Sequence, residues 1–264
     1  MPGTPVVFVH GLWLHAESWG AWIARFNEAG YQASAPGWPG DAETVAETRA
    51  SPDSVAGHGI DDVVDHYAGI IGSLETKPIV IGHSFGGLIA QRLLGNGLAA
   101  AAVGIDPAPI KGVLYLPPSA LRVASVALRN PANRKRAVSL TEGQFRYGFG
   151  NAVSAEESKA LYDRWTIPSP GAPLFEAAVA GFVPHSPAMV DTHNSTRGPL
   201  LLTSGGEDRT VPPAVVKQTR KLYNKSTAVT DVKEFPGRGH SLTIDSGWQE
   251  IADATLDWLR SQSL

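Results

Sequence analysis

Gly82-His83-Ser84-Phe85-Gly86 is the stretch that decides the fold of this chain. It follows the apolar run Pro78-Ile79-Val80-Ile81 and precedes Gly87-Leu88-Ile89-Ala90-Gln91-Arg92-Leu93-Leu94, which is typical of a helix. A Gly-x-Ser-x-Gly pentapeptide between a strand and a helix predicts a nucleophile elbow, a turn so sharp that only small residues fit two places before and after the serine. We therefore expect the Ser84 hydroxyl to project from the top of a sheet, beside the positively polarised N-terminus of the helix.

The alternative is a glycine-rich turn with an incidental serine, because the chain contains 28 glycines. The surrounding pattern favours the elbow. Short apolar runs alternate with amphipathic segments, which predicts an α/β fold with a doubly wound, mostly parallel sheet. Strands are expected near residues 6–9, 31–35, 78–81, 101–105, 199–203 and 229–235, and helices near 17–29, 61–74, 87–94, 213–223 and 248–259. In such sheets ligands bind at the carboxyl ends of the strands, where the elbow lies.

The alternation breaks between residues 117 and 197. This segment mixes helical pieces with proline and glycine and is rich in aromatic residues. Because it lies between two strand-like regions, it is predicted to be an inserted, mainly helical lid within one α/β domain of residues 1–264. Its aromatic side chains either form the core of the insertion or contact a substrate.

Composition narrows the classes of partner. The formal net charge is −3 and only 18% of residues are charged, so no basic surface for nucleic acid is expected. The absence of cysteine excludes disulfides and fits a reducing compartment. Met1-Pro2-Gly3-Thr4-Pro5 lacks the features of a signal peptide, and no apolar run approaches the roughly 20 residues of a membrane span. A cytoplasmic protein is predicted, while its oligomeric state is left open.

A serine nucleophile needs a histidine base and an acid that orients it, and behind an elbow both follow downstream, acid before base. His240 lies just beyond the last predicted strand, in the loop where the base belongs. Asp208 is the preferred acid because it precedes Thr210-Val211-Pro212 in the loop after the strand at 199–203. Glu207 beside it and Asp106 after the strand at 101–105 remain alternatives.

An oxyanion hole requires two backbone donors. One is the N–H of the residue after the nucleophile, Phe85, and the other comes from the loop after the first strand, where we choose Leu12. Removing one such donor typically costs about 3 kcal/mol of transition-state stabilisation. Trp13 and Phe182 are expected to line an apolar substrate pocket.

Together these motifs resemble the α/β-hydrolase superfamily over essentially the whole chain. The resemblance rests on four motifs in the expected order: Val9-His10-Gly11, Gly82-His83-Ser84-Phe85-Gly86-Gly87, Gly205-Gly206-Glu207-Asp208-Arg209-Thr210-Val211-Pro212 and Gly239-His240-Ser241. The usual N-terminal hairpin is missing, which resembles the plant methylesterase and hydroxynitrile lyase branch. Lyases of that branch carry a threonine after the first histidine and a lysine near the catalytic histidine. Here Gly11 and Gly237-Arg238-Gly239-His240-Ser241-Leu242 occupy those places, which favours esterase chemistry.

The resemblance implies a serine hydrolase that cleaves small to medium apolar carboxylic esters through an acyl-enzyme, without a metal or organic cofactor. Ser84 also excludes the dehalogenases and epoxide hydrolases of this fold, which use an aspartate nucleophile. Two alternatives stay open. The same triad can perform perhydrolysis or cleave lactones, amides or carbon–carbon bonds, and some proteins of this fold bind signalling ligands without catalysis.

Overall fold

A computed structural model describes residues 3–264 and shows a six-stranded sheet in the order β2-β1-β3-β4-β7-β8. Every strand pairing in this sheet is parallel, as the alternation of strands and helices predicts. The strands are β1 (Pro5–Val9), β2 (Gln32–Ser34), β3 (Ile79–His83), β4 (Ala101–Ile105), β7 (Leu200–Gly205) and β8 (Thr230–Phe235). Met1 and Pro2 lie outside the described residues. The predicted domain of residues 1–264 and the prediction about a signal peptide both include them.

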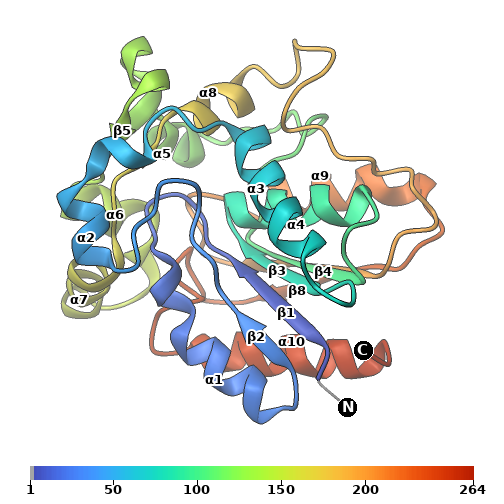
Figure 1. The fold of residues 1–264 in the computed structure, drawn as a ribbon. Coiled ribbons are helices and arrows are strands. Elements are labelled where there is room, and N and C mark those ends of the chain that lie inside the picture. Colours follow the sequence, from blue (N-terminus) through green and yellow to red (C-terminus); the bar gives the residue numbers. More distant parts are fainter. Residues whose placement is uncertain (1–2) are drawn as a thin grey trace.

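Helices cover both faces of the sheet (Figure 1), because the buried strands are apolar on both sides. One face packs against α1 (Gly20–Glu28) and α10 (Trp248–Ser261), which lie together below the sheet in Figure 1. The other face packs against α3 (Ile60–Gly72), α4 (Phe85–Gly95) and α9 (Pro213–Leu222).

The register of the strands aligns their carboxyl ends. Val9 of β1 is paired with Gly82 of β3, and His83 is paired with Ile105 of β4. The loops after these strands therefore meet at one edge of the sheet. This edge receives the β3–α4 elbow as well as the loops that follow β1, β4 and β7.

The segment 117–197, which we call the insertion, connects β4 to β7. It contains α5 (Pro118–Leu128), α6 (Glu142–Gly148), α7 (Ala155–Trp165), α8 (Ala172–Ala178) and a two-stranded antiparallel pair, β5 (Ala137–Val138) with β6 (Ser169–Pro170). It contacts the loops that follow three strands: Trp13 N–H donates to Ser169 Oγ, Asn151 Nδ2 donates to Glu207 O, and Ser241 N–H donates to Phe149 O.

No helix within residues 3–264 has both the length and the apolar character needed to cross a membrane. Short 3₁₀ turns complete the secondary structure. The helix predicted over 17–29 divides into a 3₁₀ turn, η1, and α1. The 3₁₀ turns are η1 (Ala16–Trp19), η2 (Pro52–Val55), η3 (Pro131–Lys135), η4 (Gly150–Ala152) and η5 (Tyr223–Lys225).

One helix is not anticipated by the sequence pattern. α2 (Val45–Ala50) lies in the polar stretch before Gly59 and begins with a capping box. Thr44 Oγ1 accepts the Glu47 N–H at 3.2 Å, and Glu47 Oε2 accepts the Thr44 N–H at 3.1 Å. Thr-x-x-Glu is a recognisable start signal for a helix, but only six residues follow it, too few to show a hydrophobic period.

Thr44→Ala should lower the free energy of unfolding by about 1 kcal/mol, because the Glu47 N–H loses its acceptor at the start of α2. Chemical denaturation followed by circular dichroism measures this difference. Thr44→Ser keeps the hydroxyl and serves as the control, with a loss below about 0.5 kcal/mol. Equal stabilities for the alanine and serine variants would contradict a role for the cap.

Candidate active site

Ser84 occupies a strained turn between β3 and α4. Its backbone has φ 55° and ψ −121°, a region that residues with side chains rarely adopt. The flanking glycines are required by close backbone contacts: a Cβ added to Gly82 would lie 2.0 Å from Gly86 O, and one added to Gly86 would lie 2.1 Å from Val9 O. Such strain is maintained where a side chain must be presented for function.

The loop after β1 packs directly on this serine. A Cβ at Gly11 would lie 2.7 Å from Ser84 Cβ and 2.9 Å from His83 O, so only glycine fits there. The Ser84 N–H donates to Ile105 O at 2.9 Å, which ties the turn to the end of β4. The serine is thereby fixed between the ends of β1 and β4, at the N-terminus of α4.

Asp208 and His240 form a buried pair in the loops after β7 and β8. His240 Nδ1 lies 2.6 Å from Asp208 Oδ2, and neither side chain is exposed. Asp208 Oδ1 accepts the N–H groups of Thr210 at 2.6 Å and Val211 at 2.8 Å. Burial acts to raise the pKa of Asp208, but the His240 charge and the hydrogen bonds it accepts outweigh burial and lower that pKa. Asp208 is therefore suited to remain a carboxylate.

Asp106, the alternative acid, also faces this imidazole. Its Oδ2 lies 3.8 Å from His240 Nδ1, and its Oδ1 accepts the Gly205 N–H at 2.8 Å. Burial, and then the charge of Asp208, raise the pKa of Asp106 well above its ordinary value. The two carboxyl groups therefore differ: Asp106 keeps its proton more readily, while Asp208 carries the charge. The other alternative, Glu207, is exposed.

Two aromatic rings hold the His240 imidazole. Phe149 of the insertion packs edge-on at 4.7 Å between ring centroids, and the His83 ring lies at 4.5 Å. His83 Nε2 donates to His240 O at 3.0 Å, which confirms the prediction that His83 makes a structural hydrogen bond near the site. Burial, and then the neighbouring His240, lower the pKa of His83 well below its ordinary value, which favours the neutral ring. The role of Phe149 has no signal in the sequence.

The second ring nitrogen of His240, Nε2, makes no hydrogen bond within residues 3–264. It is buried, and no hydrogen bond joins it to Ser84 in this part of the chain. Contacts between a base and its nucleophile are often long in unliganded enzymes and shorten when substrate binds. With Nδ1 held by Asp208, Nε2 is the nitrogen available to accept a proton.

Two backbone N–H groups beside Ser84 are candidates for binding an oxyanion. Phe85 is the first residue of α4, so its N–H has no acceptor within the helix. The Leu12 N–H has no hydrogen bond to any atom of residues 3–264, whereas the next one, of Trp13, donates to Ser169 Oγ at 2.6 Å. Leu12, Phe85 and Ser84 line the same cavity.

That cavity has a volume of about 220 Å³ and a largely apolar lining. Among residues 3–264, no charged side chain contributes to it, and Ser84 and Thr210 are the only hydroxyl-bearing residues in its lining. Trp13 lines it, while its contact with a substrate stays a prediction. Phe182 does not line it: it is 89% exposed in a turn after α8. The lining residues are Leu12, Trp13, Ser84, Phe85, Ala108, Pro109, Leu116, Ala120, Leu121, Val123, Ala124, Leu128, Leu174, Ala177, Ala178, Thr210 and Val211.

A larger surface groove of about 560 Å³ lies elsewhere, along residues 15–23 and 35–43. It is lined by His15, Glu17, Asp41 and His66 among others, and Ser84 is not part of it. Size alone does not select the candidate cavity. The smaller, apolar cavity is the one lined by the strained serine and by Leu12 and Phe85.

His83, Asp106 and His240 place potential metal-binding atoms within 4.8 Å of one another. However, His240 Nδ1 is engaged with Asp208, Asp106 Oδ1 with Gly205, and His83 Nε2 with His240 O. An ion bound here would compete with the hydrogen bonds that orient His240. The expectation of a metal-independent site therefore stays a prediction.

Comparisons with known proteins agree with this architecture. A model described as "Alpha/beta hydrolase family" matches residues 6–254. A monoacylglycerol lipase from Paleococcus ferrophilus superimposes with a TM-score of 0.70 at 24% identity, covering 98% of this chain and 96% of that one. An esterase from Thermogutta terrifontis gives 0.69 at 19% identity, covering 98% and 90%. A methylesterase from Arabidopsis gives 0.65 at 14% identity, covering 97% and 99%. A search of curated proteins finds no match.

Asp106→Asn should change how stability depends on pH. Since the pKa of Asp106 is raised in the folded state, the folded chain holds a proton that the unfolded chain releases near its ordinary pKa. The free energy of unfolding therefore falls as pH rises above that value, until the folded group titrates as well. Asparagine removes this loss, so the variant gains stability relative to wild type as pH rises above the ordinary pKa of aspartate, by at most about 1.4 kcal/mol per pH unit.

Urea unfolding at a series of pH values measures the difference. The exposed Asp65→Asn controls for the loss of one carboxyl group and should follow the wild-type curve. Parallel curves for wild type and Asp106→Asn would show that Asp106 ionises equally in both states.

Proposed function

Because this chain belongs to the alpha/beta hydrolase family, we propose that it is a serine hydrolase that cleaves carboxylic esters of small to medium apolar substrates through an acyl-enzyme. One observation carries the proposal. The strained Ser84 opens into an apolar cavity beside two free N–H groups, at the sheet edge that also holds the buried Asp208–His240 pair.

In the acylation step, Ser84 Oγ attacks the ester carbonyl while His240 Nε2 accepts the hydroxyl proton. Asp208 holds the proton on Nδ1 and stabilises the imidazolium that forms. The N–H groups of Leu12 and Phe85 bind the developing oxyanion. His240 then returns its proton to the leaving alkoxide, and the C–O bond to the alcohol breaks.

In the deacylation step, water takes the place of the alcohol. His240 Nε2 accepts a proton from that water as the water attacks the acyl carbon. The second oxyanion that forms is bound by the same two N–H groups. Collapse returns the proton to Ser84 and releases the acid. Every proton transfer uses Nε2, which agrees with an imidazole whose Nδ1 is bound to Asp208.

The cavity supports a neutral, apolar acyl group. One face of α5 contributes Ala120, Leu121, Ala124 and Leu128 to its wall, at the three- and four-residue spacing that places side chains on one helix face. Because α5 belongs to the insertion, we propose that residues 117–197 act as the predicted lid and set the length of acyl chain that fits.

The solved structures add support of a general kind. The similar proteins are described as a lipase, an esterase and a methylesterase, and each of these descriptions names hydrolysis of an ester. At identities of 24% or less they support the fold, while the substrate is inferred from the cavity of this chain.

Ser84→Ala should reduce the release of p-nitrophenol from short-chain esters by about 10⁴-fold or more, since the attacking oxygen is removed. Wild type should react covalently with a fluorophosphonate at Ser84, which peptide mass spectrometry identifies. Circular dichroism establishes that the variant is folded. Ser241→Ala is the matched control in another buried serine, whose hydroxyl donates to Asp245 instead. Activity retained in purified Ser84→Ala, or an unlabelled folded wild type, would refute the proposal and favour a binding protein.

Ala124→Leu should shorten the preferred acyl chain. The added carbons fill the cavity, and each displaced methylene costs about 0.8 kcal/mol of burial. We expect kcat/KM for p-nitrophenyl octanoate to fall by about 10- to 100-fold, while the acetate ester changes by less than about 3-fold. Ser125→Leu, on the exposed side of the same helix, should leave the profile unchanged. An equal loss for both esters would show that α5 does not line the acyl site.

A further inference from the structure

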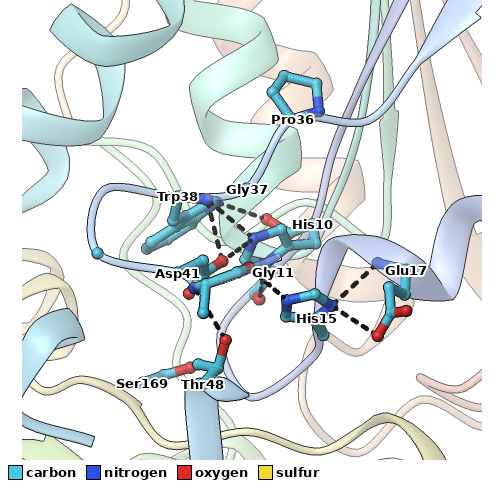
Figure 2. Close-up of polar contacts among 12 residues, drawn as sticks. His10, Gly11, His15, Glu17, Pro36, Gly37, Trp38, Asp41, Thr48 and Ser169 are labelled. Atoms are coloured by element: carbon cyan, nitrogen blue, oxygen red, sulfur yellow. Dashed lines mark hydrogen bonds and ion pairs between the residues drawn. The ribbon is translucent and has the colours of Figure 1, made fainter. Parts of the chain in front are cut away.

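The buried ring of His10 lies between two oxygen acceptors, as Figure 2 shows. Its Nδ1 is 2.9 Å from Gly11 O, and its Nε2 is 2.9 Å from Asp41 Oδ2. A carbonyl oxygen only accepts, so the contact with Gly11 O requires a proton on Nδ1. The ring and the Asp41 carboxylate are almost completely buried.

Gly11 O belongs to the same peptide group as the Leu12 N–H. The peptide is planar and trans, so its C=O and its N–H point in opposite directions. A hydrogen bond that fixes Gly11 O therefore fixes the direction of the Leu12 N–H as well. That N–H is the one that has no partner among residues 3–264 and lies in the wall of the Ser84 cavity.

The loop after β2 holds His10 in place. Trp38 Nε1 donates to His10 O at 3.0 Å, and its ring stacks on the imidazole at 5.4 Å between centroids. The Trp38 N–H donates to Asp41 Oδ2 at 3.0 Å and to His10 Nε2 at 3.3 Å. Asp41 is itself fixed by a tight turn, in which its N–H donates to Trp38 O at 3.0 Å. Backbone and ring of His10 are thus fixed from one loop.

We propose that His10, held by Asp41, is a positioning residue for the oxyanion donor. Its Nδ1–H fixes the Gly11–Leu12 peptide plane so that the Leu12 N–H faces the oxyanion formed on the acyl group at Ser84. The proposal rests on the proposed esterase function. It adds that the strength of the oxyanion hole depends on a side chain that does not touch the substrate.

Two substitutions separate the two contacts of the ring. An asparagine amide lies near the position of Nδ1, so His10→Asn keeps a donor for Gly11 O and loses Asp41. A glutamine amide lies near Nε2, so His10→Gln keeps the contact with Asp41 and loses Gly11 O. Loss of an oxyanion donor costs about 10²- to 10³-fold in kcat. For a donor that is present but misdirected, we expect His10→Gln to lower kcat by about 10- to 100-fold and His10→Asn by less than about 5-fold.

KM for a p-nitrophenyl ester should change little in either variant, because this interaction forms mainly in the transition state. The affinity for an alkyl trifluoromethyl ketone, which forms an oxyanion adduct with a serine nucleophile, should fall in parallel with kcat. His15→Gln is the matched control. His15 is buried in the same loop and contacts Ala42 O and the Glu17 N–H, so its loss should lower the melting temperature and leave kcat unchanged.

Equal kcat and ketone affinity in folded His10→Gln and wild type, or equal losses in His10→Asn and His10→Gln, would overturn the proposal. A wild type that neither cleaves esters nor binds the ketone would instead refute the proposed function. ¹⁵N NMR of the wild-type imidazole, assigned by comparison with His10→Asn, gives an answer even where the glutamine variant does not fold. A protonated Nδ1 is expected, and an unprotonated Nδ1 would overturn the proposal whatever the activity.

Discussion

The contact between the elbow and the end of β1 is the constraint on which the rest of the site depends. Gly86 approaches Val9 O so closely that no Cβ fits between them, and Gly11 approaches Ser84 in the same way. These contacts force the serine into its unusual backbone conformation and place the first loop of the chain against it. The free N–H groups of Leu12 and Phe85 lie in one cavity because two strands distant in sequence are pressed together here.

The sequence was sufficient for features that local pattern determines. Each strand of the main sheet lies within two residues of its predicted position, because buried parallel strands are short apolar runs bounded by polar residues or glycine. Asp208 and His240 could be proposed because each follows such a strand. α2 was not predicted, since a six-residue helix in a polar stretch shows its cap but no period.

Features created by packing between distant segments could not be predicted. The pairing of His10 with Asp41 joins two loops 31 positions apart, and nothing in either loop indicates it. Phe149 reaches His240 from the insertion in the same way. Phe182 illustrates the opposite case: an aromatic residue expected in the pocket lies on the surface, and small aliphatic residues of α5 and α8 line the cavity instead. The type of a residue indicates that it favours apolar contacts, but it does not indicate whether the residue lines the cavity or lies elsewhere.

The presence of two acids at one imidazole has a consequence for turnover in the proposed mechanism. In that mechanism His240 accepts a proton and then donates it to the leaving alcohol. An imidazolium that is too stable would slow the second transfer. Two carboxylates at 2.6 and 3.8 Å from Nδ1 would have that effect. Burial and the charge of Asp208 raise the pKa of Asp106, which favours its protonated form and so a single negative charge on the pair. In the proposed mechanism, the second acid thus adds shape and a hydrogen bond to the site while leaving His240 able to accept and to donate a proton.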